Sequence, residues 1–317
     1  MEINRTVVHC WFDATVSIFG MFFSAVVVLL AATKVKNKAL KSYSLMLITN
    51  ATVDFVYALN TLLTFTTAVF GEKIVFMLMD NYPITSIIGP YAALSTQLFL
   101  MFLGVAMLPL QFIYRYGVMI QKPFTNCQMF LMFCGSLMLG GLHGGLSPFT
   151  FRPRNEYYDE KLREAMDVGT NFTLPFYVVG DVSKFGIMSL HFINIFVIMA
   201  ISYSIIITMV YLSKRSVTLV CSDQLSKQTR TVQKQVTKII YLQALYPVLF
   251  VAIPCSIFPI IAVKGWQVPY FAEVAMSLMH TPPLVNSVLV IMCVPSYRRS
   301  VMRPFRTNSA RETSTIG

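Results

Sequence analysis

Long apolar runs separated by short polar stretches dominate the chain. A helix needs about 20 consecutive apolar residues to cross a hydrocarbon core about 30 Å thick. Seven runs reach this length, and little sequence lies between them. The pattern predicts an all-α integral membrane protein, with residues 1–317 forming a single seven-transmembrane domain. The predicted helices span about 11–33, 43–70, 87–113, 127–146, 185–212, 236–263 and 268–294, and residues 295–317 form a polar, basic tail.

Composition excludes a soluble protein of this size. Hydrophobic residues make up 56% of the chain and charged residues only 12%, whereas soluble proteins carry about 25% charged residues. The net charge of +11 lies in short loops between apolar runs, which is typical of membrane topology rather than of nucleic-acid binding. We therefore expect contacts with the lipid bilayer and none with nucleic acid.

Catalytic and metal-binding patterns are not found. The histidines lie on four different elements, and neither H-E-x-x-H nor G-x-S-x-G occurs. The six cysteines are scattered, with no C-x-x-C pair, which argues against a zinc site or a disulfide framework. We predict a protein that is not an enzyme and has no cofactor and no bound metal.

Basic residues follow every second predicted helix. Lysines cluster at 34–41, a strongly basic loop covers 213–238, and the tail is also basic. Positive loops remain in the cytoplasm, so the amino terminus is predicted outside and the carboxy terminus inside. Two glycosylation sequons, at Asn4 and Asn171, fall on the predicted outer side.

Polar residues inside the predicted helices are candidates for an intramembrane network. Asn50 and Asp54 lie one turn apart on the same face of the second helix, and Asn286 lies in the seventh. A carboxylate at membrane depth is costly and should face the bundle interior with a partner. Two interpretations remain open for Asp54: a functional coupling role, or a protonated side chain bonded to a neighbouring helix.

Four further polar residues fall in the predicted outer halves of the helices, amid Phe and Met. They are Gln97, His191, Asn194 and His280. Each is a candidate for contact with a small-molecule ligand, and each also suits an ordinary hydrogen bond between helices.

Prolines and glycines predict bending and close packing. Pro247, Pro254 and Pro282 interrupt the hydrogen-bond ladder of the sixth and seventh helices and are candidate hinges. The fourth helix contains two overlapping G-x-x-x-G patterns, at Gly140/Gly144 and Gly141/Gly145. Such surfaces let another helix approach closely, either within the bundle or across a dimer.

Arg115 ends the third apolar run and is flanked by Tyr114 and Tyr116. Its guanidinium is permanently charged, and tyrosines suit the headgroup zone. The residue is either an interfacial anchor or a switch that contacts a cytoplasmic partner in only one conformation. A receptor needs such a switch, a bendable helix and a basic inner surface. A ligand-gated channel, a transporter or a non-signalling membrane accessory protein is the alternative.

The chain resembles the nematode seven-transmembrane chemoreceptors of the Str superfamily, and most closely the delta class, with the Str and Srj classes next. The resemblance rests on an ordered set of short matches: Tyr43–Ser44 with Asn50 and Asp54, Gly89–Pro90, Phe112–Tyr116, Gln233–Gln235 with Gln243 and Pro247, and Pro295–Arg298.

This resemblance implies a G-protein-coupled receptor for an environmental small molecule such as an odorant, signalling to a heterotrimeric G protein. It also implies the plasma membrane of chemosensory cilia, and it gives Arg115 the position of the arginine that ends the third helix of rhodopsin-like receptors. Tyr114 replaces the acidic residue that usually precedes this arginine. The usual outer disulfide and the N-P-x-x-Y motif of the seventh helix are also missing.

Overall fold

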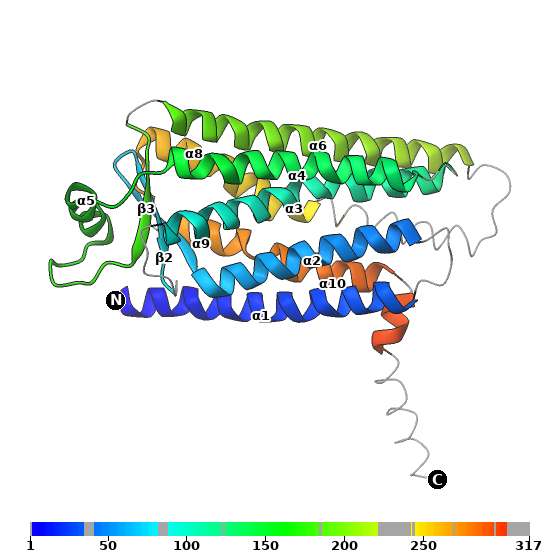
Figure 1. Ribbon diagram of the computed structural model, residues 1–317, viewed down its shortest axis with the longest axis horizontal. Coiled ribbons are helices and arrows are strands. Elements are labelled where there is room, and N and C mark those ends of the chain that lie inside the picture. The colour runs from blue at the N-terminus through cyan, green and yellow to red at the C-terminus, as the bar shows by residue number, and fades with distance from the viewer. Residues whose placement is uncertain are drawn as a thin grey trace, which may run out of the picture.

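A computed structural model describes residues 2–34, 41–81, 88–120, 122, 124–183, 186–220, 242, 245–268, 270–294 and 296–302. Seven helical spans in these ranges are long and apolar enough to cross a membrane. They form an elongated bundle, with the amino-terminal end of α1 (Glu2–Lys34) at one end and the helical turns at 296–302 at the other (Figure 1). The predicted all-α seven-helix architecture is confirmed.

The first four spans are single helices: α1 (Glu2–Lys34), α2 (Lys41–Thr64), α3 (Gly89–Met119) and α4 (Asn126–Thr150). Two boundaries differ from the predicted ones in ways that affect the site. Helix α1 begins about ten residues earlier than expected, so the segment around Asn4 is helical. Helix α3 continues past Ile113, so Arg115 lies within the helix rather than after it.

Helices α3 and α4 pack through one of the two G-x-x-x-G faces. A Cβ added at Gly144 would lie 2.6 Å from Cβ of Phe99, and one at Gly140 would lie 3.0 Å from Cα of Leu103. An added Cβ at Gly141 or Gly145 would meet no heavy atom within 4 Å among the described residues. The Gly140/Gly144 face is therefore used for packing inside the bundle.

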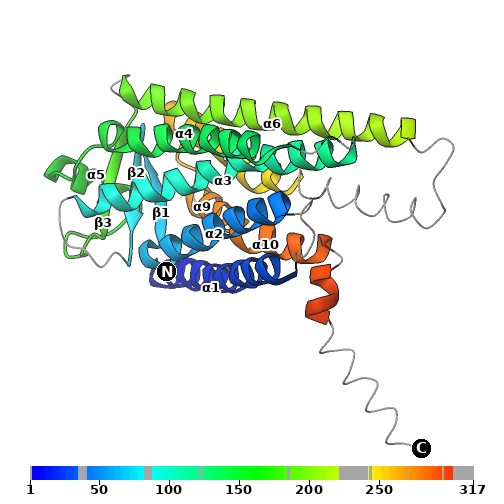
Figure 2. The ribbon, with the colours of Figure 1, turned by 45° about the vertical axis from the view of Figure 1, so that its right-hand side comes forward.

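A three-stranded antiparallel sheet closes the amino-terminal end of the bundle, here called the sheet end (Figures 1 and 2). Its strands are β1 (Thr66–Gly71), β2 (Ile74–Met79) and β3 (Phe176–Asp181), in the order β1-β2-β3. The predicted second helix, 43–70, is wrong at its end. Phe65 has a positive φ of 42° after Thr64, and the β-branched and aromatic residues that follow favour a strand.

Strand β2 is buried on both faces, which explains why it is apolar throughout. Val75, Met77 and Met79 join the main core of the bundle. Ile74, Phe76 and Leu78 point to the other face, where they pack with residues of α5 (Glu156–Met166), including Tyr158 and Leu162. The alternation follows from the two-residue period of a strand, and it makes the sheet a layer between the bundle and α5.

Asp181 anchors this outer layer. Its carboxylate accepts hydrogen bonds from the Tyr158 hydroxyl at 3.0 Å and from the Ser183 backbone N–H at 3.0 Å. Burial acts to raise the pKa of Asp181, but hydrogen bonds from Ser183 and Tyr158, with the charge of Arg152, outweigh it and hold the pKa below its usual value. The ionised carboxylate is therefore the form that the folded layer favours.

The last three spans differ in regularity. Helix α6 (Ile187–Val220) is continuous. The sixth span is described from Leu245 and contains the π-helix η2 (Val248–Ala252), followed by α8 (Ile253–Lys264). The seventh span is broken into α9 (Phe271–Met279) and α10 (Pro282–Cys293). Most of the predicted basic loop 213–238, and the tail beyond residue 302, lie outside the described residues.

Candidate functional site

A cavity of about 60 Å³ lies inside the bundle at the sheet end. Helices α3, α6, α8 and α9 surround it, and Val75 and Met77 of β2 close it on the side of the sheet. Five methionines and four phenylalanines line it. The full lining is Tyr57, Val75, Met77, Leu94, Gln97, Leu98, Met101, Phe102, Phe151, Met188, His191, Phe192, Ile195, Cys255, Phe258, Met276 and Met279.

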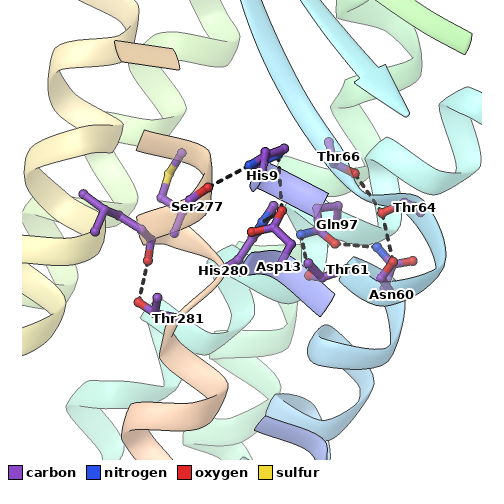
Figure 3. A network of polar contacts seen from close by, with 12 residues as sticks. His9, Asp13, Asn60, Thr61, Thr64, Thr66, Gln97, Ser277, His280 and Thr281 are labelled. Atoms are coloured by element: carbon purple, nitrogen blue, oxygen red, sulfur yellow. Dashed lines mark hydrogen bonds and ion pairs between the residues drawn. The ribbon is translucent and has the colours of Figure 1, made fainter. Parts of the chain in front are cut away.

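Two polar residues of the lining are bonded to neighbouring helices. The Gln97 side chain donates to the Thr61 hydroxyl at 3.1 Å, accepts a hydrogen bond from the Asn60 amide and also bonds to Tyr57. The Tyr57 hydroxyl donates to the backbone carbonyl of Met279 at 3.0 Å. Figure 3 shows Gln97 directed toward Asn60 and Thr61 of α2. These bonds fix α2 against α3 and α9 at the edge of the cavity.

His191 lines the cavity from α6 and is 2% exposed. Its ring packs against His143, with centroids 4.1 Å apart, and meets the edge of Phe151 at 5.5 Å. Its Nδ1 atom is buried and has no hydrogen-bond partner among the described residues. Asn194 does not line the cavity; its amide lies 3.2 Å from Nδ1 of His143.

His280 lies in a separate buried polar cluster with His9, Asp13 and Ser277. Nδ1 of His280 lies 2.9 Å from Oδ2 of Asp13, and Nε2 of His9 lies 3.3 Å from the same oxygen. Nδ1 of His9 lies 2.8 Å from the Ser277 hydroxyl. Figure 3 shows these side chains converging between α1 and α9. Asp13 is fully buried, so the cluster joins the first span to the seventh.

Sequence reasoning did not identify His9 or Asp13 as site residues. A signal was present, because the two residues are four positions apart and therefore share one face of a helix. It could be used only if the helix was known to begin before residue 9. His143 was also missed as a neighbour of the ligand candidates.

Two of the three residues proposed for the intramembrane polar network, Asp54 and Asn286, contact each other in the structure. The side chains of Asp54 and Asn286 form a hydrogen bond between α2 and α10. Asn50 lies on α2 one turn away, but both polar atoms of its side chain are buried without a partner among the described residues. The structure therefore joins Asp54 to Asn286 and leaves Asn50 beside them.

Arg115 lies near the end of α3 opposite the sheet. Tyr114 is buried at 2% exposure, whereas Arg115 and Tyr116 are partly exposed. The guanidinium is close enough to Cys293, at the end of α10, for its charge to act on that thiol. Arg115 is thus positioned between the third span and the seventh, at the end where the chain leaves the bundle.

The three candidate hinge prolines lie where the helices depart from regular α geometry. Pro247 directly precedes the π-helix η2, Pro254 falls in the first turn of α8, and Pro282 begins α10 after the break at His280–Thr281. Of the two sequon asparagines, Asn171 is exposed in the loop between α5 and β3. No group of three His, Cys, Asp or Glu side chains in the described ranges could hold a metal ion.

Comparison with known proteins gives two findings. The family model described as "Serpentine type 7TM GPCR chemoreceptor Str" matches residues 10–302. Among solved structures, the chain is similar to the crystal structure of squid rhodopsin, with a TM-score of 0.65 and 13% sequence identity, over 96% of this chain and 86% of that chain. At this identity the likeness shows the fold alone. No curated protein sequence matches the chain.

Proposed function

The chain belongs to the Str family of serpentine seven-transmembrane chemoreceptors, and on that premise we propose that it binds an environmental small molecule in the cavity and signals to a heterotrimeric G protein. The family and the rhodopsin-like fold support a receptor of the G-protein-coupled type. The observation that carries the proposal is the cavity itself, which is bounded by the third, fifth, sixth and seventh spans and closed by the sheet.

We propose that the sheet end faces outward and that the end with Arg115 faces the cytoplasm. The basic residues of the inner loops and the exposed Asn171 support this orientation. Asn171 lies exposed in the loop between α5 and β3, and we propose it as a glycosylation site, whereas the segment around Asn4 is helical. The proposed location is the plasma membrane of chemosensory cilia. We also propose that the protein comes from a nematode and that it belongs to the delta class of the superfamily.

Signalling requires two packings of the bundle that differ in affinity for the ligand. The cavity contacts α8 and α9, and each of these helices adjoins an irregular segment: η2 for the first and the His280–Thr281 break for the second. A π-helix often marks a functional site. We propose that ligand binding shifts these two spans at Pro247, Pro254 and Pro282, and that Arg115 and its flanking tyrosines transmit the shift to the G protein.

The test is signalling by Arg115→Ala in a heterologous cell. An amino-terminal tag on unpermeabilised cells measures surface display, and dissociation of a G protein measures the response to panels of small molecules. We expect the variant to reach the surface and to lose the response.

The matched control is Arg298→Ala, which removes an exposed arginine from the helical turns at 296–302 and should still respond. A normal response from well-displayed Arg115→Ala would refute the switch role. A ligand-gated current without any G protein would favour the channel alternative.

A further inference from the structure

The sheet covers the cavity most thickly at its centre. Val75 and Met77 of β2 face the cavity, and α5 packs on the opposite face of the same strand. A molecule that came from outside through β2 would have to cross both layers. Of the two edge strands, β3 pairs with Arg152 through a β-bridge, whereas β1 packs against α9. The junction between β1 and α9 is therefore the place where side chains alone separate the cavity from the outside.

A second hollow, here called the outer hollow, lies at this junction and measures about 240 Å³. Residues Ala68–Phe70 of β1 form one wall, and Ala272 and Glu273 of α9 form another. Tyr270 also lines the outer hollow and is 55% exposed. The outer hollow therefore reaches the surface of the protein at the sheet end.

Two elements run from the outer hollow to the cavity. On α9, Ala272 lines the outer hollow and Met276 lines the cavity, and residues four apart lie on the same face of a helix. On the sheet, Phe70 lines the outer hollow and pairs with Val75, which lines the cavity. Residues paired across antiparallel strands point to the same face. The two spaces therefore lie along one face of α9 and one face of the sheet.

A group of phenylalanine rings separates the two spaces. The Phe70 ring is 8% exposed, with its centroid 4.6 Å from that of Phe258 and 6.4 Å from that of Phe271. Phe258 lines the cavity from α8. A phenylalanine side chain has no hydrogen-bonding group, so its movement to another staggered rotamer leaves no polar atom without a partner. Phe70 can therefore open a path at the cost of its apolar contacts alone.

We propose that the outer hollow is the entrance through which ligands reach the cavity and that Phe70 is its gate. The inference rests on the proposed function, because it takes the cavity as the place where a ligand binds. It gives the strands different roles: β2 seals the cavity, and the edge strand β1 carries the residue that admits the ligand.

The test uses Cys255 as a reporter inside the cavity, where it is 4% exposed. The full chain in lipid nanodiscs is treated with methyl methanethiosulfonate, a small uncharged reagent. The Cys255 thiolate attacks the sulfenyl sulfur of the reagent, forms a disulfide bond and releases methanesulfinate. The added S–CH₃ group fits a cavity of about 60 Å³, because a group of the size of water needs roughly 10–15 Å³. Mass spectrometry of the peptide that contains Cys255 gives its rate of modification separately from those of the other cysteines.

Three variants connect this rate to the gate. Phe70→Ala removes both ring contacts, so we expect the rate to rise at least about tenfold. Phe70→Leu keeps a branched apolar side chain and should give an intermediate rate. The matched control is Phe76→Ala, which removes a fully buried ring from the opposite face of the sheet and should leave the rate near the wild-type value. Each reaction is run well below the thermal midpoint of the variant, so that unfolding does not expose Cys255.

The proposal is overturned if Cys255 in Phe70→Ala reacts at the wild-type rate, a result that would favour entry from the lipid between helices. It is also overturned if Phe76→Ala accelerates the reaction as much, because the effect would then come from a loosened sheet. The reaction needs neither a ligand nor a G protein. A failure of the signalling test would therefore reject the receptor function and leave this result as it is.

Discussion

The cavity is lined by apolar side chains, whereas the adjoining cluster encloses a carboxylate between two histidines. Helix α9 separates the two regions. Met276 and Met279 line the cavity, and Ser277 and His280 contact His9 and Asp13 on α1. Residues three apart share a face of a helix, so each pair defines one face. The comparison shows that a polar residue at the sheet end can serve helix packing and contribute nothing to ligand contact.

The largest expected effect comes from removing the carboxylate of the polar cluster. Asp13→Leu leaves Nδ1 of His280 buried without its hydrogen-bond partner and removes the carboxylate that lies 3.3 Å from Nε2 of His9. We expect the free energy of unfolding to fall by about 3 kcal/mol, measured as a lower thermal unfolding midpoint and reduced surface display.

Asp13→Asn is the matched control, because it keeps a hydrogen-bond acceptor of the same size and should cost about 1 kcal/mol. The affinity of the surviving folded protein for an active molecule from the small-molecule panel should change little, since Asp13 does not line the cavity. An Asp13→Leu protein as stable as the wild type would show that the cluster is dispensable for packing.

The second change fills the cavity and should cost less stability than the loss of Asp13. Leu98→Trp places a larger side chain among Met101, Phe102 and Ile195. We expect the affinity for an active molecule from the small-molecule panel to fall at least about tenfold, while overpacking costs about 1–2 kcal/mol of unfolding free energy. Leu98→Met conserves volume and serves as the control. Undiminished binding to Leu98→Trp would place the ligand elsewhere.

The comparison also explains which site residues could be predicted from the sequence. Gln97 and His191 do line the cavity, but Asn194 and His280 contact other parts of the protein. Spacing tells which residues share a helix face, and it does not tell toward which neighbour that face is turned. The rotation of each helix depends on packing, as with Gly140 and Gly144, whose face meets α3 while the adjacent glycines meet nothing described.

The seven spans could be predicted because their apolar length alone decides them. The sheet could not, because a strand buried on both faces has the same continuous apolar pattern as a membrane helix. Residues 66–70 of β1 were therefore assigned to the second helix, although their Thr, Val and Phe content favours a strand. Strand β2 fell in the predicted loop. For this reason the sequence analysis did not predict that β2 closes the cavity at the sheet end.

The smallest expected effect involves Asp181, a carboxylate held by neutral donors outside the spans. Its pKa is lowered in the folded protein, so its contribution to stability is present above the pKa of the unfolded chain, about 3.9. That contribution is lost as the pH falls through the lower folded value. At neutral pH, Asp181→Asn should lower the free energy of unfolding by about 1 kcal/mol.

The measurement is the difference in thermal midpoint between wild type and Asp181→Asn at several pH values. We expect a difference at pH 7 that shrinks as the pH falls below the unfolded value of about 3.9 and through the lower folded value. The effect should be confined to the layer formed by β3 and α5, because Tyr158 and Ser183 are the partners of this carboxylate. Faster hydrogen exchange in that layer, with unchanged exchange in α3, would match this expectation. A difference that grew in acid would mean that the folded protein favours the protonated form of Asp181, contrary to this expectation.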